Sequence, residues 1–189
     1  MGGLQTGYPG LEYLSDKISD YIPECKYFAE PFAGLGRISK KVKADYYALN
    51  DKSNFAYAYL KENFKSPFIY NLDFEEFYYK FNFESTIMFF DPPWSRTDYE
   101  KNNRTFCDRG VGEYYTKIFK LLTCAKCHWI VAGRALGGAR STLSKYARSN
   151  YNIILWNNKK SINGHTPKVL LVSNKPFVRQ STLRGNGNE

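Results

Sequence analysis

Segments with helical spacing alternate with short apolar segments along most of this chain. Residues 11–21 carry apolar side chains three and four positions apart, which is the spacing of an amphipathic helix. Residues 86–90 (Thr-Ile-Met-Phe-Phe) form an unbroken apolar run, which is typical of a strand buried on both faces. Similar patterns predict strands at 27–29, 46–49, 68–70, 128–132, 151–156 and 168–173, and helices at 37–43, 55–64, 74–81, 112–123 and 139–148.

This alternation predicts an α/β fold: a Rossmann-like, mostly parallel sheet of seven strands with helices on both faces. No helix separates the last two strands, so we expect residues 157–167 to join them as an antiparallel hairpin at one edge. The length of 189 residues suits one domain, which we place at 1–178, followed by a polar tail at 179–189.

Acidic residues follow four of the predicted strands. Glu30, Asp51, Asp73 and Asp91 each lie at or just past a strand end. Ligands of parallel α/β sheets bind beyond the carboxyl ends of the strands. We therefore expect the functional site at this edge.

A glycine-rich turn follows the first of these strands, in the sequence Glu30-Pro31-Phe32-Ala33-Gly34-Leu35-Gly36. Gly34 and Gly36 allow a tight turn and a close approach of the backbone to a ligand. Ser39 stands where the dinucleotide fingerprint has its third glycine, and the Walker lysine pattern is absent. The turn therefore disfavours a dinucleotide or a nucleoside triphosphate.

Two of the acidic residues suit a nucleoside ligand. The two carboxylate oxygens of Asp51 can accept hydrogen bonds from both hydroxyls of a ribose. Asp73 can accept from an adenine amino group, and Phe74 can cover the ring. The alternative for such an aspartate at a strand-to-helix junction is a helix N-cap.

The most specific feature is the tetrapeptide Asp91-Pro92-Pro93-Trp94, directly after the buried strand. The prolines hold the chain extended and remove two N–H donors. The Asp91 carboxylate and the Pro92 carbonyl remain as acceptors, and together they can bind both hydrogens of one amino group. The nitrogen lone pair is then free to attack a methyl sulfonium, while Trp94 offers a surface on which a flipped base can stack.

With these motifs the chain, from Tyr8 to about Pro176, resembles the Dam-like family of DNA adenine-N6 methyltransferases. Residues 30–36 match the cofactor motif of that family, Asp51 and Asp73-Phe74 match its two following acidic positions, and residues 91–94 match its catalytic motif. The resemblance implies a Rossmann-like methyltransferase sandwich and S-adenosylmethionine as the methyl donor. It also implies direct attack by the amino nitrogen, with no covalent intermediate. The cofactor-binding residues that it implies are Tyr8, Glu30, Pro31, Phe32, Gly34, Gly36, Asp51, Asp73 and Phe74.

Three features depart from the family pattern. Residues 7–11 lack the lysine of the usual Gly-Gly-Lys, and Trp94 stands where tyrosine is usual. The interval between Asp73 and Asp91 is also too short for the target-recognition insertion of the members that read a DNA site. The resemblance therefore covers the chemistry and not the recognition of a sequence.

The positive charge of the chain lies entirely in its second half. Residues 1–90 hold 10 lysines and arginines and 12 acidic residues, a net charge of −2, whereas residues 91–189 hold 17 and 6, a net charge of +11. This favours a polyanionic partner over a merely solvated basic face. The candidate nucleic-acid contacts are Arg96, Arg104, Arg109, Arg134, Arg140, Lys159 and Lys160.

We therefore expect DNA as the substrate, with three alternatives: RNA with the same chemistry, a non-catalytic nucleic-acid-binding relative, and methylation of a protein glutamine amide. A homodimer or a separate specificity partner is compatible with the missing insertion. Four cysteines, among them Cys124 and Cys127, form no complete metal-ligand pattern, so we expect no metal. No apolar run is long enough for a membrane span, so we expect a cytoplasmic protein.

Overall fold

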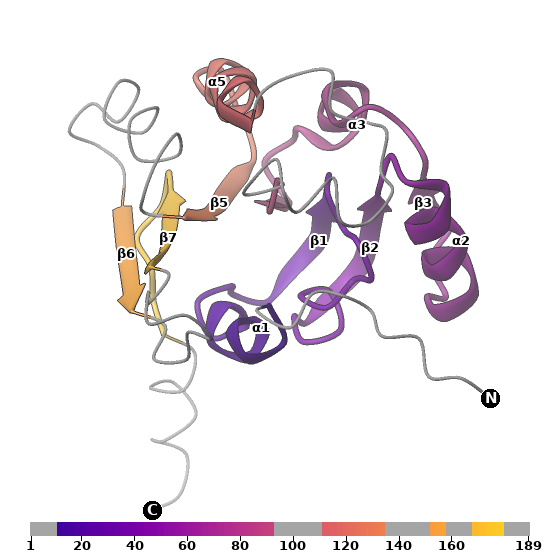
Figure 1. Ribbon diagram of the computed structural model, residues 1–189, viewed down its shortest axis with the longest axis horizontal. Helices are drawn as coiled ribbons and strands as arrows, with labels where there is room; N and C mark the ends of the chain where they lie inside the picture. Colours follow the sequence, from indigo (N-terminus) through magenta and orange to yellow (C-terminus); the bar gives the residue numbers. More distant parts are fainter. Residues whose placement is uncertain (1–10, 93–110, 135–151, 158–167, 180–189) are drawn as a thin grey trace, which may run out of the picture.

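One mixed sheet forms the centre of the molecule. The computed structural model describes residues 11–92, 111–134, 152–157 and 168–179. The strands within these ranges form one sheet in the order β3-β2-β1-β4-β5-β7-β6 (Figure 1). Their bounds are β1 (Cys25–Glu30), β2 (Ala44–Asn50), β3 (Phe68–Tyr70), β4 (Thr86–Phe90), β5 (His128–Arg134), β6 (Asn152–Asn157) and β7 (Lys168–Ser173).

The strand directions confirm the predicted fold class. Strands β1 to β5 pair in parallel, and β7 runs antiparallel to both β5 and β6 at one edge of the sheet. Each described strand lies within three residues of its predicted position at either end. The loop predicted at 157–167 lies outside the described residues, apart from Asn157, which is the last residue of β6.

Four helices surround this sheet in the described ranges: α1 (Leu11–Ser19), α2 (Asn54–Asn63), α3 (Phe74–Phe81) and α5 (Val111–Leu122). Their bounds confirm four of the predicted helices to within two residues at either end. The predicted helix at 139–148 lies outside the described residues. None of the helices within the described ranges combines the length and the apolar character that a bilayer crossing requires.

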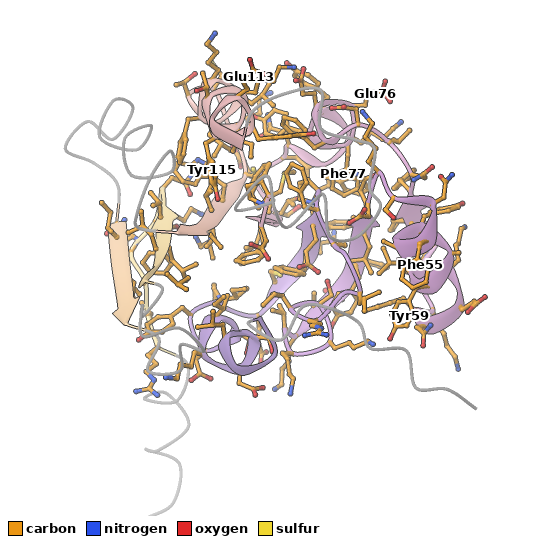
Figure 2. The ribbon with its side chains drawn as sticks, viewed as in Figure 1. Phe55, Tyr59, Glu76, Phe77, Glu113 and Tyr115 are labelled. Atoms are coloured by element: carbon orange, nitrogen blue, oxygen red, sulfur yellow. The ribbon has the colours of Figure 1, made fainter. Side chains whose placement is uncertain are left out.

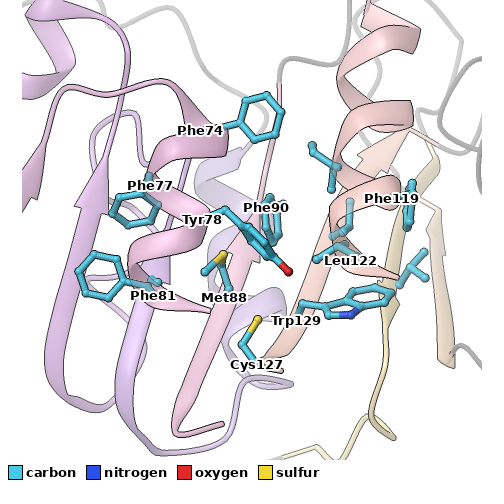
Figure 3. Packing of buried hydrophobic residues seen from close by; sticks show 14 of the residues in the cluster. Phe74, Phe77, Tyr78, Phe81, Met88, Phe90, Phe119, Leu122, Cys127 and Trp129 are labelled. Carbon is cyan, nitrogen blue, oxygen red and sulfur yellow. The ribbon is translucent and has the colours of Figure 1, made fainter. Parts of the chain in front are cut away.

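Helices α3 and α5 cover one face of the sheet, and α1 covers the other (Figure 1). Figure 3 shows the first of these layers, with Phe77, Tyr78 and Phe81 of α3 and Phe119 and Leu122 of α5 around Met88, Phe90 and Trp129. On the opposite face, Leu14 and Ile18 of α1 belong to a cluster with Ile87 and Phe89. Alternate residues of β4 therefore enter opposite layers, which explains why the whole strand is apolar.

The layer of α3 and α5 is also held by polar contacts between the two helices. The Tyr78 hydroxyl donates to the Leu121 carbonyl at 3.0 Å, and Lys117 forms an ion pair with Glu75. Figure 2 shows Phe77 on the sheet side of α3 and Glu76 on its outer side, as the amphipathic pattern predicts.

The predicted helix at residues 37–43 is wrong. These residues form consecutive turns without a regular helix. The Lys40 and Val42 amides donate four residues back, to Gly36 and Ile38, whereas the Lys41 amide donates three residues back, to Ile38. The Ser39 amide donates to the Glu30 carboxylate instead of to a main-chain carbonyl. This side-chain contact interrupts the bonding that a continuous helix needs.

Candidate active site

The predicted acidic residues meet at the carboxyl edge of neighbouring strands. In the sheet register, Glu30 of β1 pairs with Leu49 of β2, and Ala29 pairs with Met88 of β4. Asp51 and Asp91 therefore both lie two residues beyond the level of Glu30, directly after the strands that flank β1. Both of these carboxylates act electrostatically on Glu30. The structure thus brings three of the predicted site residues together.

Glu30 is buried at the base of this cluster. Its side chain is only 2% exposed and accepts hydrogen bonds from the hydroxyl and the amide of Ser39. Burial raises the pKa of Glu30 from its ordinary value of 4.5 to about 8, and the negative charges of Asp91 and Asp51 add to that effect, against the hydrogen bonds from Ser39. Glu30 therefore keeps its proton at neutral pH unless a positive charge lies nearby.

The glycine turn beside Glu30 needs both of its glycines, for different reasons. Gly34 and Gly36 have φ values of +53° and +64°, in the left-handed region that favours glycine. A Cβ atom on Gly36 would lie 2.4 Å from the Phe64 ring, whereas one on Gly34 would meet nothing within 4 Å. The backbone at Gly34 therefore has open space beside it, whereas the Phe64 ring leaves no room for a side chain at Gly36.

Asp51 holds this turn in place. One of its carboxylate oxygens accepts from the Gly34 amide at 2.8 Å, and the other accepts from the Ser53 amide at 2.8 Å. Each carboxylate oxygen can accept more than one hydrogen bond, so these contacts are compatible with ribose hydroxyls as further donors. The alternative that the sequence offered for Asp51, a helix N-cap, is not what the structure has, because Ser53 is the N-cap of α2.

Asp73 and Phe74 open α3 at the same edge. Asp73 is the N-cap of α3, accepting from the Glu75 amide at 3.2 Å, and it forms an ion pair with Lys52 at 3.2 Å. The capping role proposed as an alternative is therefore present. Phe74 is 4% exposed, and its ring centroid lies 5.1 Å from that of Phe32. Contact of Asp73 and Phe74 with an adenine stays a prediction.

A buried amide at this edge was not identified from the sequence. Asn50, the last residue of β2, is 1% exposed and binds main-chain atoms of the loops after β1 and β3. Its position immediately before Asp51 was the available signal. The side-chain periodicity gives no sign that Asn50 is buried or that it binds the neighbouring loops.

The described part of the predicted catalytic motif follows β4, the central strand of the sheet. Asp91 is half-buried and Pro92 is buried, directly after β4. Arg134 is the last residue of β5. The other predicted site residues lie outside the described ranges: Tyr8, Pro93, Trp94, Arg96, Arg104, Arg109, Arg140, Lys159 and Lys160.

The fold is shared with solved methyltransferase structures. The chain is similar to M. jannaschii TYW2 in complex with AdoMet (TM-score 0.55, 15% identity, 89% of this chain and 77% of that one). It is also similar to the M. jannaschii tRNA m1G37 methyltransferase (TM-score 0.56, 16% identity, 89% and 51%). A third is an rRNA methylase from Streptococcus thermophilus (TM-score 0.52, 8% identity, 85% and 93%). No protein-family model matches the sequence, and no curated protein matches it. These likenesses establish the Rossmann-like methyltransferase fold.

Substitution of the two glycines should lower the free energy of unfolding by different amounts. Gly34→Ala and Gly36→Ala both place a side chain at positive φ, which costs about 1 kcal/mol in the free energy of unfolding. We expect Gly36→Ala to lose roughly 1–3 kcal/mol more, because its methyl group overlaps Phe64. Urea denaturation of the two variants measures the difference. Equal midpoints would contradict the contact with Phe64.

The raised pKa of Glu30 predicts a stability that depends on pH. Between pH 4.5 and about 8 the folded protein keeps a proton that the unfolded chain has lost, so stability falls as pH rises through this range. Glu30→Gln should remove that decline and become the more stable protein, by about 1–3 kcal/mol near pH 8.

Thermal unfolding from pH 5 to 8.5 tests this, with Glu84→Gln as the control because Glu84 is exposed. The gap between Glu30→Gln and the wild type should widen with pH, whereas the control should follow the wild type. Parallel curves for all three proteins would contradict the buried, protonated state of Glu30.

Proposed function

We propose that this protein binds S-adenosylmethionine at the carboxyl edge of β1, β2 and β3. The open backbone at Gly34 supports this proposal, as do the acceptor oxygens of Asp51 and the AdoMet bound in the similar M. jannaschii TYW2. The negative charges of Asp51 and Asp91 at this edge are compatible with the positively charged sulfur of such a ligand. When bound, the cofactor supplies an electrophilic methyl group on a positively charged sulfur.

The residues proposed to hold it are those implied by the Dam-like resemblance. Glu30, Pro31, Phe32, Gly34, Gly36 and Asp51 would line the turn after β1 and the end of β2, and Asp73 and Phe74 would approach the adenine. Tyr8 belongs to this set on sequence grounds alone. Asp51 and Asp73 would serve the ligand in addition to the main-chain amides that they already bind.

We further propose that the methyl acceptor is the exocyclic N6 amino group of adenine in nucleic acid. The observation that supports this is the position of Asp91-Pro92 directly after β4. This strand is the parallel neighbour of β1, and the glycine turn at Gly34 and Gly36 follows β1. Two acceptors, the Asp91 carboxylate and the Pro92 carbonyl, would bind the two amino hydrogens. Held in this way, the amino nitrogen would have its lone pair free for the methyl group that the cofactor would supply, with the sulfur as the leaving group, and one amino proton would pass to solvent. Pro93 and Trp94 would complete the base site.

DNA is the substrate that the Dam-like motifs favour, and RNA is the second candidate. Two of the similar structures are, by name, a tRNA and an rRNA methylating enzyme, and this favours RNA. The net charge of +11 over residues 91–189 suits either polyanion and argues against a protein glutamine substrate. The intact acceptor Asp91 argues against a non-catalytic relative.

A methyl-transfer assay with labelled S-adenosylmethionine tests the chemistry on single- and double-stranded DNA, RNA and protein extract. We expect N6-methyladenine in one class of nucleic acid. Asp91→Ala should lower the rate at least a hundredfold, roughly the effect of removing one preorganised acceptor or donor from an active site. Binding of S-adenosylhomocysteine should change little in the same variant.

Glu84→Ala is the matched control, because Glu84 is exposed and precedes the opposite end of β4. Its rate should equal that of the wild type. Label recovered in cytosine or in protein would contradict the adenine proposal, and full activity of Asp91→Ala would contradict the role of that residue.

The charge asymmetry predicts binding that depends on salt. If residues 96–160 contact phosphates, the logarithm of the association constant should fall linearly with the logarithm of the salt concentration, by roughly 0.7–0.9 per phosphate contact. Fluorescence anisotropy with labelled oligonucleotides from 50 to 300 mM salt measures this slope. Replacing Lys159 and Lys160 by alanine should make the slope shallower, and an unchanged slope would exclude these two residues as contacts.

A further inference from the structure

The side chain of Asn50 joins two loops that are distant in sequence. Its Nδ2 atom donates to the Pro31 carbonyl at 2.9 Å and to the Leu72 carbonyl at 3.1 Å. Its Oδ1 atom accepts from the Leu72 amide at 2.8 Å. Asn50 is 1% exposed, so water has little access to replace these bonds.

The main chain around Asn50 extends this connection. The Ala33 amide donates to the Asn50 carbonyl at 2.8 Å, and the side-chain amide of Asn71 donates to the Asp51 carbonyl at 2.8 Å. The Asp51 carboxylate in turn binds the Gly34 amide. The loops after β1, β2 and β3 are therefore one hydrogen-bonded unit, with Asn50 at its centre.

Only a primary amide at this position can make all three bonds. Both of its N–H groups meet carbonyl oxygens, and its oxygen meets an amide. Aspartate has the same shape, but its carboxylate would face two carbonyl oxygens without a proton to donate. Alanine would leave the Pro31 and Leu72 groups without this partner in a buried place, which is costly.

We propose that Asn50 is a positioning residue for the cofactor site. It fixes the distance between the turn at Gly34 and Gly36 and the segment Asp73-Phe74, so that one ligand can contact both. Asn50 acts through the main chain of Pro31 and Leu72 and does not itself touch the ligand. This inference rests on the proposed function, because it assigns both segments to one S-adenosylmethionine site.

The test compares Asn50→Asp and Asn50→Ala with the wild type, using S-adenosylhomocysteine as the probe in titration calorimetry. We expect the dissociation constant to rise roughly ten- to a hundredfold, the effect of leaving buried hydrogen-bonding groups unpaired. All titrations are made at a temperature at which each variant is folded, as checked by thermal unfolding. If Asn50→Asp does not fold, Asn50→Ala and Asn50→Ser decide the result.

Asn174 offers a matched control at the opposite ends of the parallel strands, where β5 begins. Its amide also joins the ends of two chain segments, because it donates to the Cys127 carbonyl at 3.1 Å and accepts from the Trp129 amide at 2.9 Å. Asn174→Asp should lower the melting temperature, as the Asn50 variants do. Its affinity for S-adenosylhomocysteine should remain within about threefold of the wild type, since no cofactor segment depends on it.

Hydrogen exchange gives a second measurement that does not require a ligand. In Asn50→Ala the amides of Leu72 and Gly34 should exchange faster, whereas in Asn174→Asp they should keep wild-type protection. Wild-type affinity in the Asn50 variants, or an equal loss of affinity in Asn174→Asp, would overturn the proposal. Failure of the wild-type protein to bind S-adenosylhomocysteine is a separate result, and it would contradict the proposed function itself.

Discussion

Burial of β4 on both faces is the constraint on which the site depends. All five residues of this strand are buried between the layer of α3 and α5 and the layer of α1. A charge inside such a strand would have to be removed from water without a partner, which costs several kcal/mol or more. The first place for a carboxylate is therefore the strand end, where Asp91 follows. Glu30 is the last residue of β1, after Phe28 and Ala29, and is itself buried, and the raised pKa of Glu30 reflects the cost of a charge at that depth. Because β1 and β4 are parallel neighbours, Glu30 and Asp91 lie at the same ends of adjacent strands.

The strands and helices can be predicted well from the sequence, because each of them follows from the spacing of apolar side chains. Unbroken apolar runs and helical spacing placed the described strands and four of the helices, and the acidic residues followed from the strand ends. The turns at 37–43 were predicted as a helix because the sequence pattern contains no sign that Ser39 bonds back to Glu30. Such a contact depends on how the chain folds back on itself, and no local spacing reports it. The role of Asn50 was missed for the same reason, since its partners lie 19 and 22 residues away.

The structural contacts of Asp51 and Asp73 are compatible with the ligand roles proposed for them. Asp51 was predicted to bind a ribose, and the structure has it binding the amides of Gly34 and Ser53. Asp73 was predicted to approach an adenine, and it caps α3. In both cases the local contacts place the carboxylate at the edge of the sheet, which is where a ligand would need it. Glu30 is different, because its carboxyl group is buried and accepts hydrogen bonds from Ser39.

The strand order has a consequence for the way the chain acquires its structure. The glycine turn and its first strand are made early in synthesis, but β1 pairs with β4 across an interval of nearly 60 residues, as in the contact of Ala29 with Met88. Until residue 90 has left the ribosome, one edge of β1 has no partner, and β2 and β3 extend the sheet only on the other side. Long-range parallel pairings of this kind are slow to form and leave strand edges exposed in the meantime. The pairing of β1 with β4, which sets the ends of these two strands side by side, therefore forms only after residue 90 has been made.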